Sequence, residues 1–138
     1  MKLERELTNT ILEDILAHEG NVPWPYCDSK GYVTIGIGHL VRDADALVRL
    51  PLVVGDSNVQ ADEATKRRAF TSVHVAYSPG HSANAYKSCS NVRLPKGAAL
   101  VLCQARLEDE FLPSLLKLFH DLETWPDQAV RAVVDIAY

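Results

Sequence analysis

The stretch YCDSKGYVTIGIGH, residues 26–39, decides how this chain is expected to fold. Its polar turn, DSKG at 28–31, stands between aromatic and β-branched residues, a pattern that predicts a β-hairpin. Along the second strand, large apolar residues at 33, 35 and 37 alternate with Thr34, Gly36 and Gly38, so the two sets face opposite sides. The glycines have two interpretations. They permit a bulge or bend, or they leave this face of the strand free of side chains so that a ligand can bind there.

Helical periodicity is found on both sides of this hairpin. Residues 3–18 place their leucines and isoleucines mostly on one face, and Gly20 stands where a C-terminal cap is expected, so Glu19 lies at the end of that helix. Residues 61–75 and the chain from 95 onward are also expected to be helical, whereas 41–60 are expected to be irregular. The expectation is an α+β chain, mainly helical, with a small N-terminal hairpin lobe. We expect one domain over 1–138, in which 1–40 hold the first helix and the hairpin and 41–138 form a helical lobe.

The last predicted helix is unusually apolar. Thr124 is its expected N-cap, and its apolar side chains point around much of the circumference: Val130, Val133, Val134 and Ile136. A helix with this pattern needs cover from other elements. We therefore expect that the chain is a C-terminally truncated form, with an incomplete helical lobe, and that it self-associates through this helix.

The charge and the cysteine content argue against a nucleic-acid partner and against a metal or redox site. The net charge is −4 and no basic stripe is present, which argues against nucleic acid as a partner. The short basic run at 66–68 is interpreted as a solvated helix face. The three cysteines, Cys27, Cys89 and Cys103, lack metal or redox spacing and are expected to be reduced thiols. No cofactor or metal is predicted.

No segment predicts a signal peptide or a membrane span. A protein made in the cytoplasm without a leader would need another route to any substrate outside it.

Two carboxylates stand at element boundaries, Glu19 at a helix end and Asp28 in the turn. Glycosidic bonds are usually cleaved by a pair of carboxyl groups, of which one donates a proton and the other activates water or attacks the sugar. Residues at element boundaries can face a cleft while the backbone holds them in place. Glu19 and Asp28 are therefore candidates for such a pair.

The motif His18-Glu19-Gly20, followed by residues 26–39, resembles the signature of the phage-type lysozymes, or endolysins (glycoside hydrolase family 24). That family has a glutamate at the end of its first helix, then an aspartate and a threonine at the spacing of Glu19, Asp28 and Thr34. The resemblance is close over 15–40 and loose over 92–138, where WPDQAVRAVVDIAY is similar to a family segment that normally continues into Asn-Leu-Gly. Residues 41–91 show no clear match.

The resemblance implies a muramidase that hydrolyses the β-1,4 bond between N-acetylmuramic acid and N-acetylglucosamine in peptidoglycan strands. Glu19 would be the general acid, with a pKa raised by partial burial, while Asp28 and Thr34 would hold the attacking water. A water between carboxylate and sugar implies inversion at the anomeric carbon. Gly36 and Gly38 would contact substrate. The enzyme would act on the wall, in the periplasm, after release by a holin or a secretion system.

His39 closes the motif at the end of the strand. It is interpreted as a structural histidine that braces the hairpin against the next segment.

Three alternatives remain open at this point. The TIGIG stretch at 34–38 could begin a dinucleotide-binding loop, but it lacks the third glycine and the chain opens with a helix. A lytic transglycosylase would use a lone glutamate and would not need Asp28 and Thr34. A non-catalytic wall-binding or interaction module derived from a truncated lysozyme is the third alternative.

Overall fold

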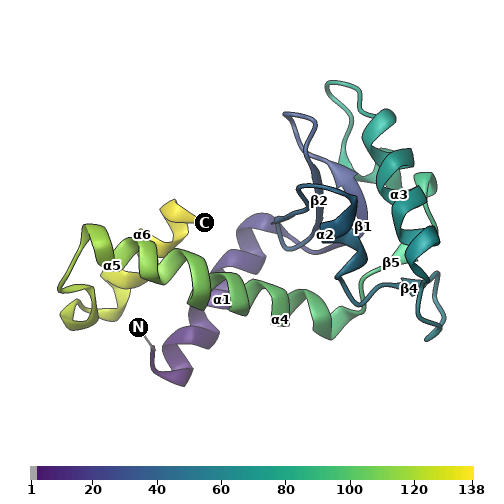
Figure 1. Cartoon of the computed structure of the whole chain (residues 1–138). Helices are drawn as coiled ribbons and strands as arrows, with labels where there is room; N and C mark the ends of the chain where they lie inside the picture. Colours follow the sequence, from purple (N-terminus) through teal and green to yellow (C-terminus); the bar gives the residue numbers. More distant parts are fainter. Residues whose placement is uncertain (1–2) are drawn as a thin grey trace. The chain divides into compact units, whose positions relative to one another are not determined.

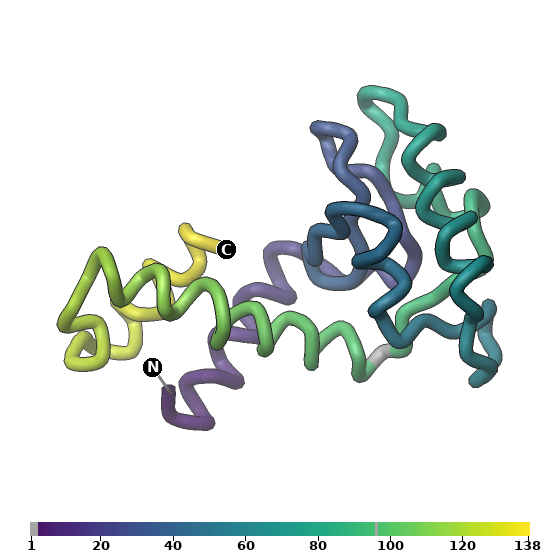
Figure 2. The backbone as a smooth tube through the Cα atoms, in the orientation of Figure 1, coloured from purple at the N-terminus to yellow at the C-terminus, as the bar shows by residue number. Residues whose placement is uncertain are grey.

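The computed structural model describes residues 3–138, apart from the side chain of Lys96. The described residues are 56% helical and contain two small antiparallel sheets, which confirms the predicted α+β class (Figure 1). The chain divides into two compact units (Figure 2). Unit 1 combines Met1–Gly20 with Leu100–Tyr138, and unit 2 is Asn21–Ala99. Residues 1–40 therefore contribute to both units.

The larger sheet of unit 2 is a three-stranded meander, β1 (Val22–Cys27), β2 (Val33–Gly36) and β3 (His39–Leu40), in that order. The predicted hairpin of β1 and β2 is present, with Cys27 opposite Val33. The second strand is shorter than predicted, because the chain turns at residues 37–38 and returns as β3. Gly36 and Gly38 have φ values of 67° and 63°, a region that glycine enters at little cost.

Strand β1 is irregular because it carries two prolines. The register of its pairing with β2 shifts between Val22 and Tyr26, around Pro23 and Pro25. Proline has no N–H to donate to a ladder and is tolerated at irregular or edge positions. The carbonyl of Pro23 instead accepts the N–H of Leu94 at 2.8 Å, which ties β1 to the segment after β5.

Residues 41–60, predicted to be irregular, contain two short elements. These are α2 (Ala44–Val48) and β4 (Val53–Val54), which pairs with β5 (Val92–Arg93) in a second sheet. The segment between α3 and β5 includes a 3-10 helix, η1 (Ala83–Cys89). These elements supply much of the core of unit 2, whose fully buried side chains include Val33, Ile35, Leu47, Leu52, Val73, Tyr86 and Val92.

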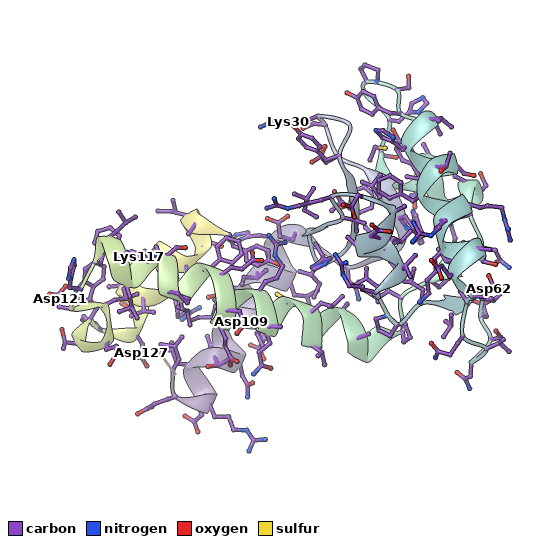
Figure 3. All side chains as sticks on the ribbon, viewed as in Figure 1. Lys30, Asp62, Asp109, Lys117, Asp121 and Asp127 are labelled. Carbon is purple, nitrogen blue, oxygen red and sulfur yellow. The ribbon has the colours of Figure 1, made fainter. Side chains whose placement is uncertain are left out.

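Helix α3 (Glu63–Val75) packs against β1 and β2. Asp62, labelled in Figure 3, caps its first turn by accepting the N–H of Thr65 at 2.7 Å. The prediction that the basic run at 66–68 is wholly solvated is wrong at Lys66, which is 9% exposed. Its ammonium donates to the carbonyls of Val48 and Leu50, at 3.0 and 2.6 Å, and so satisfies the last carbonyls around the end of α2.

Unit 1 is helical: α1 (Arg5–Glu19), the part of α4 (Lys96–Arg106) from Leu100 onward, a π-helical turn η2 (Leu107–Phe111), α5 (Leu112–Leu118), a 3-10 turn η3 (Leu122–Thr124) and α6 (Asp127–Ala137). The π turn has a local cause. Pro113 has no N–H for the carbonyl of Asp109 and its ring crowds the preceding turn, so regular α-helical bonding cannot continue there.

Helix α6 begins differently from the prediction. Its N-cap is Pro126, without a side-chain bond, while the hydroxyl of Thr124 donates to the carbonyl of Asp121, the N-cap of η3. The predicted Thr124 cap is therefore wrong. Of the four valine and isoleucine side chains on this helix, Val130 and Val134 are buried, Val133 is half-buried and Ile136 is 86% exposed. Self-association through α6 stays a prediction.

None of the helices in the described part of the chain combines the length and the apolar character needed to cross a membrane.

Candidate functional site

Asp28 occupies the first position of the turn between β1 and β2. Its Oδ1 accepts the main-chain N–H groups of Lys30 and Tyr32, each at 2.9 Å. Figure 3 labels Lys30 on this turn. The second carboxylate oxygen has no hydrogen bond among the described residues. One oxygen thus holds the turn, and the other remains able to accept a bond from a bound molecule.

Thr34 is tied to Asp28 through one carbonyl group. The carbonyl oxygen of Tyr32 accepts the N–H of Asp28 at 2.9 Å and the hydroxyl of Thr34 at 3.1 Å. Because the Thr34 hydroxyl spends its only hydrogen on this bond, its oxygen can only accept from another group. Thr34 is 6% exposed.

The side chains of Asp28 and Thr34 share one face of the hairpin. Asp28 lies opposite Tyr32, and Thr34 follows two residues later on the same strand, where side chains point to the same side. Cys27 points to the opposite side, and its thiol donates to the carbonyl of Val73 in α3 at 3.3 Å. Burial raises the pKa of the Cys27 thiol, which keeps it protonated and unsuited to act as a nucleophile.

The turn itself is braced by Tyr77. The Tyr77 hydroxyl donates to the carbonyl of Ser29 at 2.9 Å. Gly31 adopts φ of 86°, and a Cβ atom there would approach the ring of Tyr77 to 3.3 Å. The loop has three residues, with the N–H of Gly31 bonded to the carbonyl of Asp28 and a glycine in the left-handed region, a common hairpin type.

The remaining residues of the motif lie at the β2–β3 turn. A Cβ atom on Gly36 would meet Leu94 at 3.0 Å and Ala99 at 3.6 Å, so this glycine is packed closely against other side chains. That packing favours the interpretation in which the glycine permits a bend. Gly38 and His39 are half-buried, and His39 pairs with Ile35 as part of β3. A substrate contact by Gly36 or Gly38 stays a prediction, as does the structural role of His39.

Glu19 is the last residue of α1 in unit 1, whereas Asp28 and Thr34 belong to unit 2. Gly20 follows with φ of 69° and bonds to the carbonyl of Leu16, so the predicted helix end is confirmed. The Glu19 side chain is exposed, whereas the resemblance implies partial burial. It borders a depression of about 240 Å³ whose other lining residues are Ile15, His18, Asp135 and Tyr138.

An aromatic cluster lies next to Glu19 in unit 1. The rings of Phe111 and Tyr138 are 4.9 Å apart, and the guanidinium of Arg106 lies 5.3 and 5.7 Å from their centroids. Burial raises the pKa of the Tyr138 hydroxyl well above its ordinary value, with a hydrogen bond to Cys103 and the charge of Glu19 acting in the same direction. The sequence gives no local signal for this cluster, because its members come from different helices.

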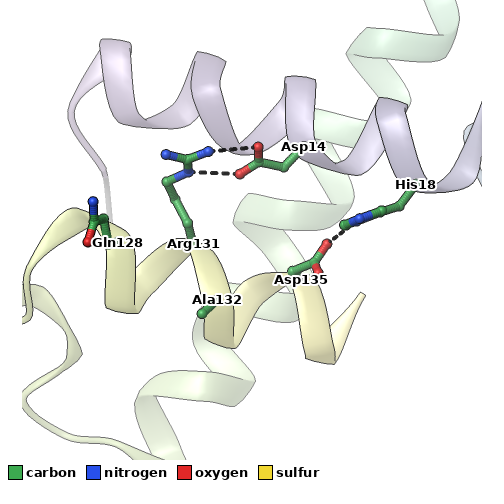
Figure 4. Close-up of a pocket in the computed structure, with 6 residues that line it drawn as sticks. All are labelled: Asp14, His18, Gln128, Arg131, Ala132 and Asp135. Carbon is green, nitrogen blue, oxygen red and sulfur yellow. Dashed lines mark hydrogen bonds and ion pairs between the residues drawn. The ribbon is translucent and has the colours of Figure 1, made fainter.

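One ion pair and one histidine–carboxylate hydrogen bond join α1 to α6, and neither was predicted from the sequence. Arg131 binds both carboxylate oxygens of Asp14 at 2.9 Å, and the Nδ1 of His18 lies 2.5 Å from Asp135 (Figure 4). The bond from Arg131 lowers the pKa of Asp14. The signal in the sequence was a spacing of four residues on each helix. It places Asp14 and His18 on one face of α1, and Arg131 and Asp135 on one face of α6.

The described residues hold no group of three or more His, Cys, Asp or Glu side chains arranged to bind a metal ion. Comparison with known proteins identifies no relative, since no protein-family model, curated protein or solved structure matches the chain.

Proposed function

We propose that this chain is a peptidoglycan-degrading muramidase of the phage-type lysozyme kind, with Glu19 as general acid and with water held by Asp28 and Thr34. The proposal rests on the spacing of these three residues within a motif that resembles the family signature over 15–40. The structural observation that supports it most is the pair of hydrogen bonds to the carbonyl of Tyr32, one from the Asp28 main chain and one from the Thr34 hydroxyl.

The local chemistry around Asp28 and Thr34 suits an attacking water. Both side chains present acceptors on the same face of the hairpin, namely the unused carboxylate oxygen and the Thr34 hydroxyl oxygen. A water that donates one hydrogen to each acceptor would keep an oxygen lone pair for the anomeric carbon. The Asp28 carboxylate would then take the proton that this water releases, while Glu19 would protonate the leaving oxygen. Hydrolysis by this route inverts the anomeric carbon.

The turn geometry supports the assignment for a second reason. A catalytic group works best when other bonds fix its position. Asp28 is fixed by two main-chain N–H groups, and Tyr77 fixes the turn in which it stands. The lysozyme-like fold is proposed on the same basis.

Turbidity of purified cell walls provides the test. Glu19→Gln is expected to abolish lysis while leaving the midpoint of thermal unfolding nearly unchanged, because the side chain is exposed and the change is isosteric. Glu13→Gln, an exposed carboxylate on the same helix, is the matched control and should lyse walls like the parent. Undiminished lysis by Glu19→Gln would overturn the assignment.

Product analysis separates the neighbouring mechanisms. A hydrolase releases reducing muramic acid ends, whereas a lytic transglycosylase releases anhydro-sugars. An anhydro product would replace the hydrolytic proposal with the second mechanism. Wall binding without any lysis by the parent chain would instead favour a non-catalytic module.

A further inference from the structure

Unit 2 has an open cavity of about 410 Å³ that is not lined by Asp28 or Thr34. Its apolar wall includes Trp24 and Pro23 from β1 and Leu94 after β5, and its polar wall includes Lys87 and Arg93. A cavity of this size accommodates a monosaccharide or a short peptide, since small-molecule sites begin at about 300 Å³.

The indole of Trp24 is held in place within this wall. Its Nε1–H donates to the carbonyl of Ala83 at 2.8 Å. The ammonium of Lys87 lies 5.1 Å from the ring centroid, and the guanidinium carbon of Arg93 lies 5.8 Å from it. Cations at such distances are attracted to the face of an indole. The ring therefore brings two positive charges together beside the cavity.

Arg93 is also held by the main chain, yet it keeps donors for a ligand. Its Nη1 donates to the carbonyls of Ser90 and Val92, and its Nη2 donates to the carbonyl of Lys87. A guanidinium has five N–H donors, so Nε–H and one hydrogen on Nη2 remain unused in the described structure. Donors on adjacent nitrogens of a guanidinium match the two oxygens of a carboxylate.

In the described structure, neither cation has a carboxylate as a direct partner. Among the described residues, Lys87 and Arg93 form no ion pair with a carboxylate, although Asp56 lines the same cavity. The ammonium of Lys87 has no hydrogen-bond acceptor in the described part of the chain. In a protein whose net charge is −4, two unpaired cations at one cavity favour an anionic ligand.

We propose that this cavity binds a carboxylate of the wall peptides, with the attached sugar or apolar group lying against Trp24 and Pro23. The choice of ligand rests on the proposed function, because carboxylates are the anionic groups that peptidoglycan peptides carry next to their sugars. The cavity lies within unit 2, and its lining does not include Glu19, Asp28 or Thr34. It would bind the peptide part of a strand, whereas the proposed catalytic residues act on the sugar part.

Fluorescence of Trp24 gives a direct readout in a Trp125→Phe background, because the chain has only these two tryptophans. The probes are muramyl dipeptide as the free acid, the same compound with its carboxylate converted to an amide, and inorganic phosphate. The free acid is expected to change the fluorescence saturably. The amide is expected to bind at least roughly tenfold more weakly, a difference of about 1.4 kcal/mol, because it cannot form the charge-assisted bonds. Phosphate keeps a negative charge but lacks the group that would lie against Trp24 and Pro23, so it is also expected to bind more weakly than the free acid.

Variants then test the two cations. Lys87→Gln is expected to weaken binding of the free acid about tenfold, and Lys87→Arg should restore most of it. Lys117→Gln, an exposed lysine on α5, is the control and should bind like the parent. Arg93→Gln also removes three bonds to the main chain, so its thermal unfolding must be measured alongside its binding.

Two outcomes overturn the proposal: equal binding of acid and amide, or unchanged binding by Lys87→Gln. Phosphate that binds as tightly as the free acid would overturn the choice of a wall peptide and leave a general anion site. Glu19→Gln is expected to keep full binding of the free acid. If that variant still lyses walls, the proposed function fails while the binding result for this cavity stands by itself.

Discussion

The Oδ1 atom of Asp28 accepts the main-chain N–H of Tyr32 at 2.9 Å, across the turn that joins β1 to β2. The same residue pair is bonded a second time, from the N–H of Asp28 to the carbonyl of Tyr32. Asp28 is therefore a structural residue of the hairpin as well as a proposed catalytic one. The two roles belong to different atoms, so substitutions can separate them.

Asp28→Asn is expected to abolish wall lysis while changing the free energy of unfolding by less than about 1 kcal/mol, because an amide oxygen still accepts both N–H bonds. Asp28→Ala should also abolish lysis but should cost roughly 1–3 kcal/mol, since two main-chain donors lose their acceptor. Urea unfolding and wall turbidity measure the two effects. Asp43→Asn, at the capping position of α2, is the control that should leave lysis intact. Lysis by Asp28→Asn at the rate of the parent would contradict the proposed role of Asp28.

Gly31→Ala is expected to destabilise unit 2 for two reasons, the positive φ of 86° and the ring of Tyr77 at 3.3 Å. Gly80 offers a matched control, because its φ is 83° and nothing lies within 4 Å of the position of its Cβ. Gly80→Ala should therefore show the backbone cost alone, about 1–2 kcal/mol. Gly31→Ala should exceed it in thermal or urea unfolding. Equal losses at both positions would mean that the Tyr77 contact adds nothing.

Lys66→Met is expected to cost roughly 1–3 kcal/mol of stability, because the carbonyls of Val48 and Leu50 would lose their donor in a buried place. Methionine keeps most of the apolar length of the side chain, so packing changes little. Arg68→Met, on an exposed position of the same helix, is expected to stay near the parent value. Chemical denaturation of both variants compares them. A stability equal to that of the parent would show that water replaces the ammonium at no cost.

The Asp14–Arg131 pair predicts an acid dependence of unit 1. Arg131 lowers the pKa of Asp14 below the ordinary 3.8, so the pair stabilises the folded state above that pH and its contribution is lost as pH falls through the lowered pKa. Asp14→Asn should be less stable than the parent at pH 7, and the difference should shrink as the pH falls below about 4. Trp125 fluorescence in a Trp24→Phe background reports on unit 1. A difference between parent and variant that is the same at pH 7 and pH 3 would contradict this origin.

The sequence predicted those parts of the fold that depend on near neighbours. The end of α1 at Gly20 and the DSKG turn each rest on bonds between residues four positions apart. The shared face of Asp28 and Thr34 also follows from strand alternation. The predicted Thr124 cap was wrong for a similarly local reason, since its hydroxyl donates to the carbonyl of Asp121, three residues earlier.

Features that depend on distant partners could not be predicted in this way. Lys66 is buried because the end of α2 and the residues after it, a segment expected to be irregular, present carbonyls to its ammonium. The two side-chain contacts between α1 and α6 join residues 117 positions apart. The close packing of Gly36 needs Leu94 and Ala99, and the cavity beside Trp24 needs β1, η1 and β5 together.

The division of the chain into units has a consequence for the order in which it folds. Unit 2 is one continuous segment, so its β-hairpin and α3 can assemble while the ribosome is still adding later residues. Unit 1 cannot be completed until α6 has been synthesised. Only then can Asp14 and His18 on α1 bind their partners on α6. Until then the apolar face of α1, with Ile11 and Ile15, has no native cover from α6. Nascent chains arrested before α6 are therefore expected to show a protease-resistant unit 2 beside an α1 that is still cleaved.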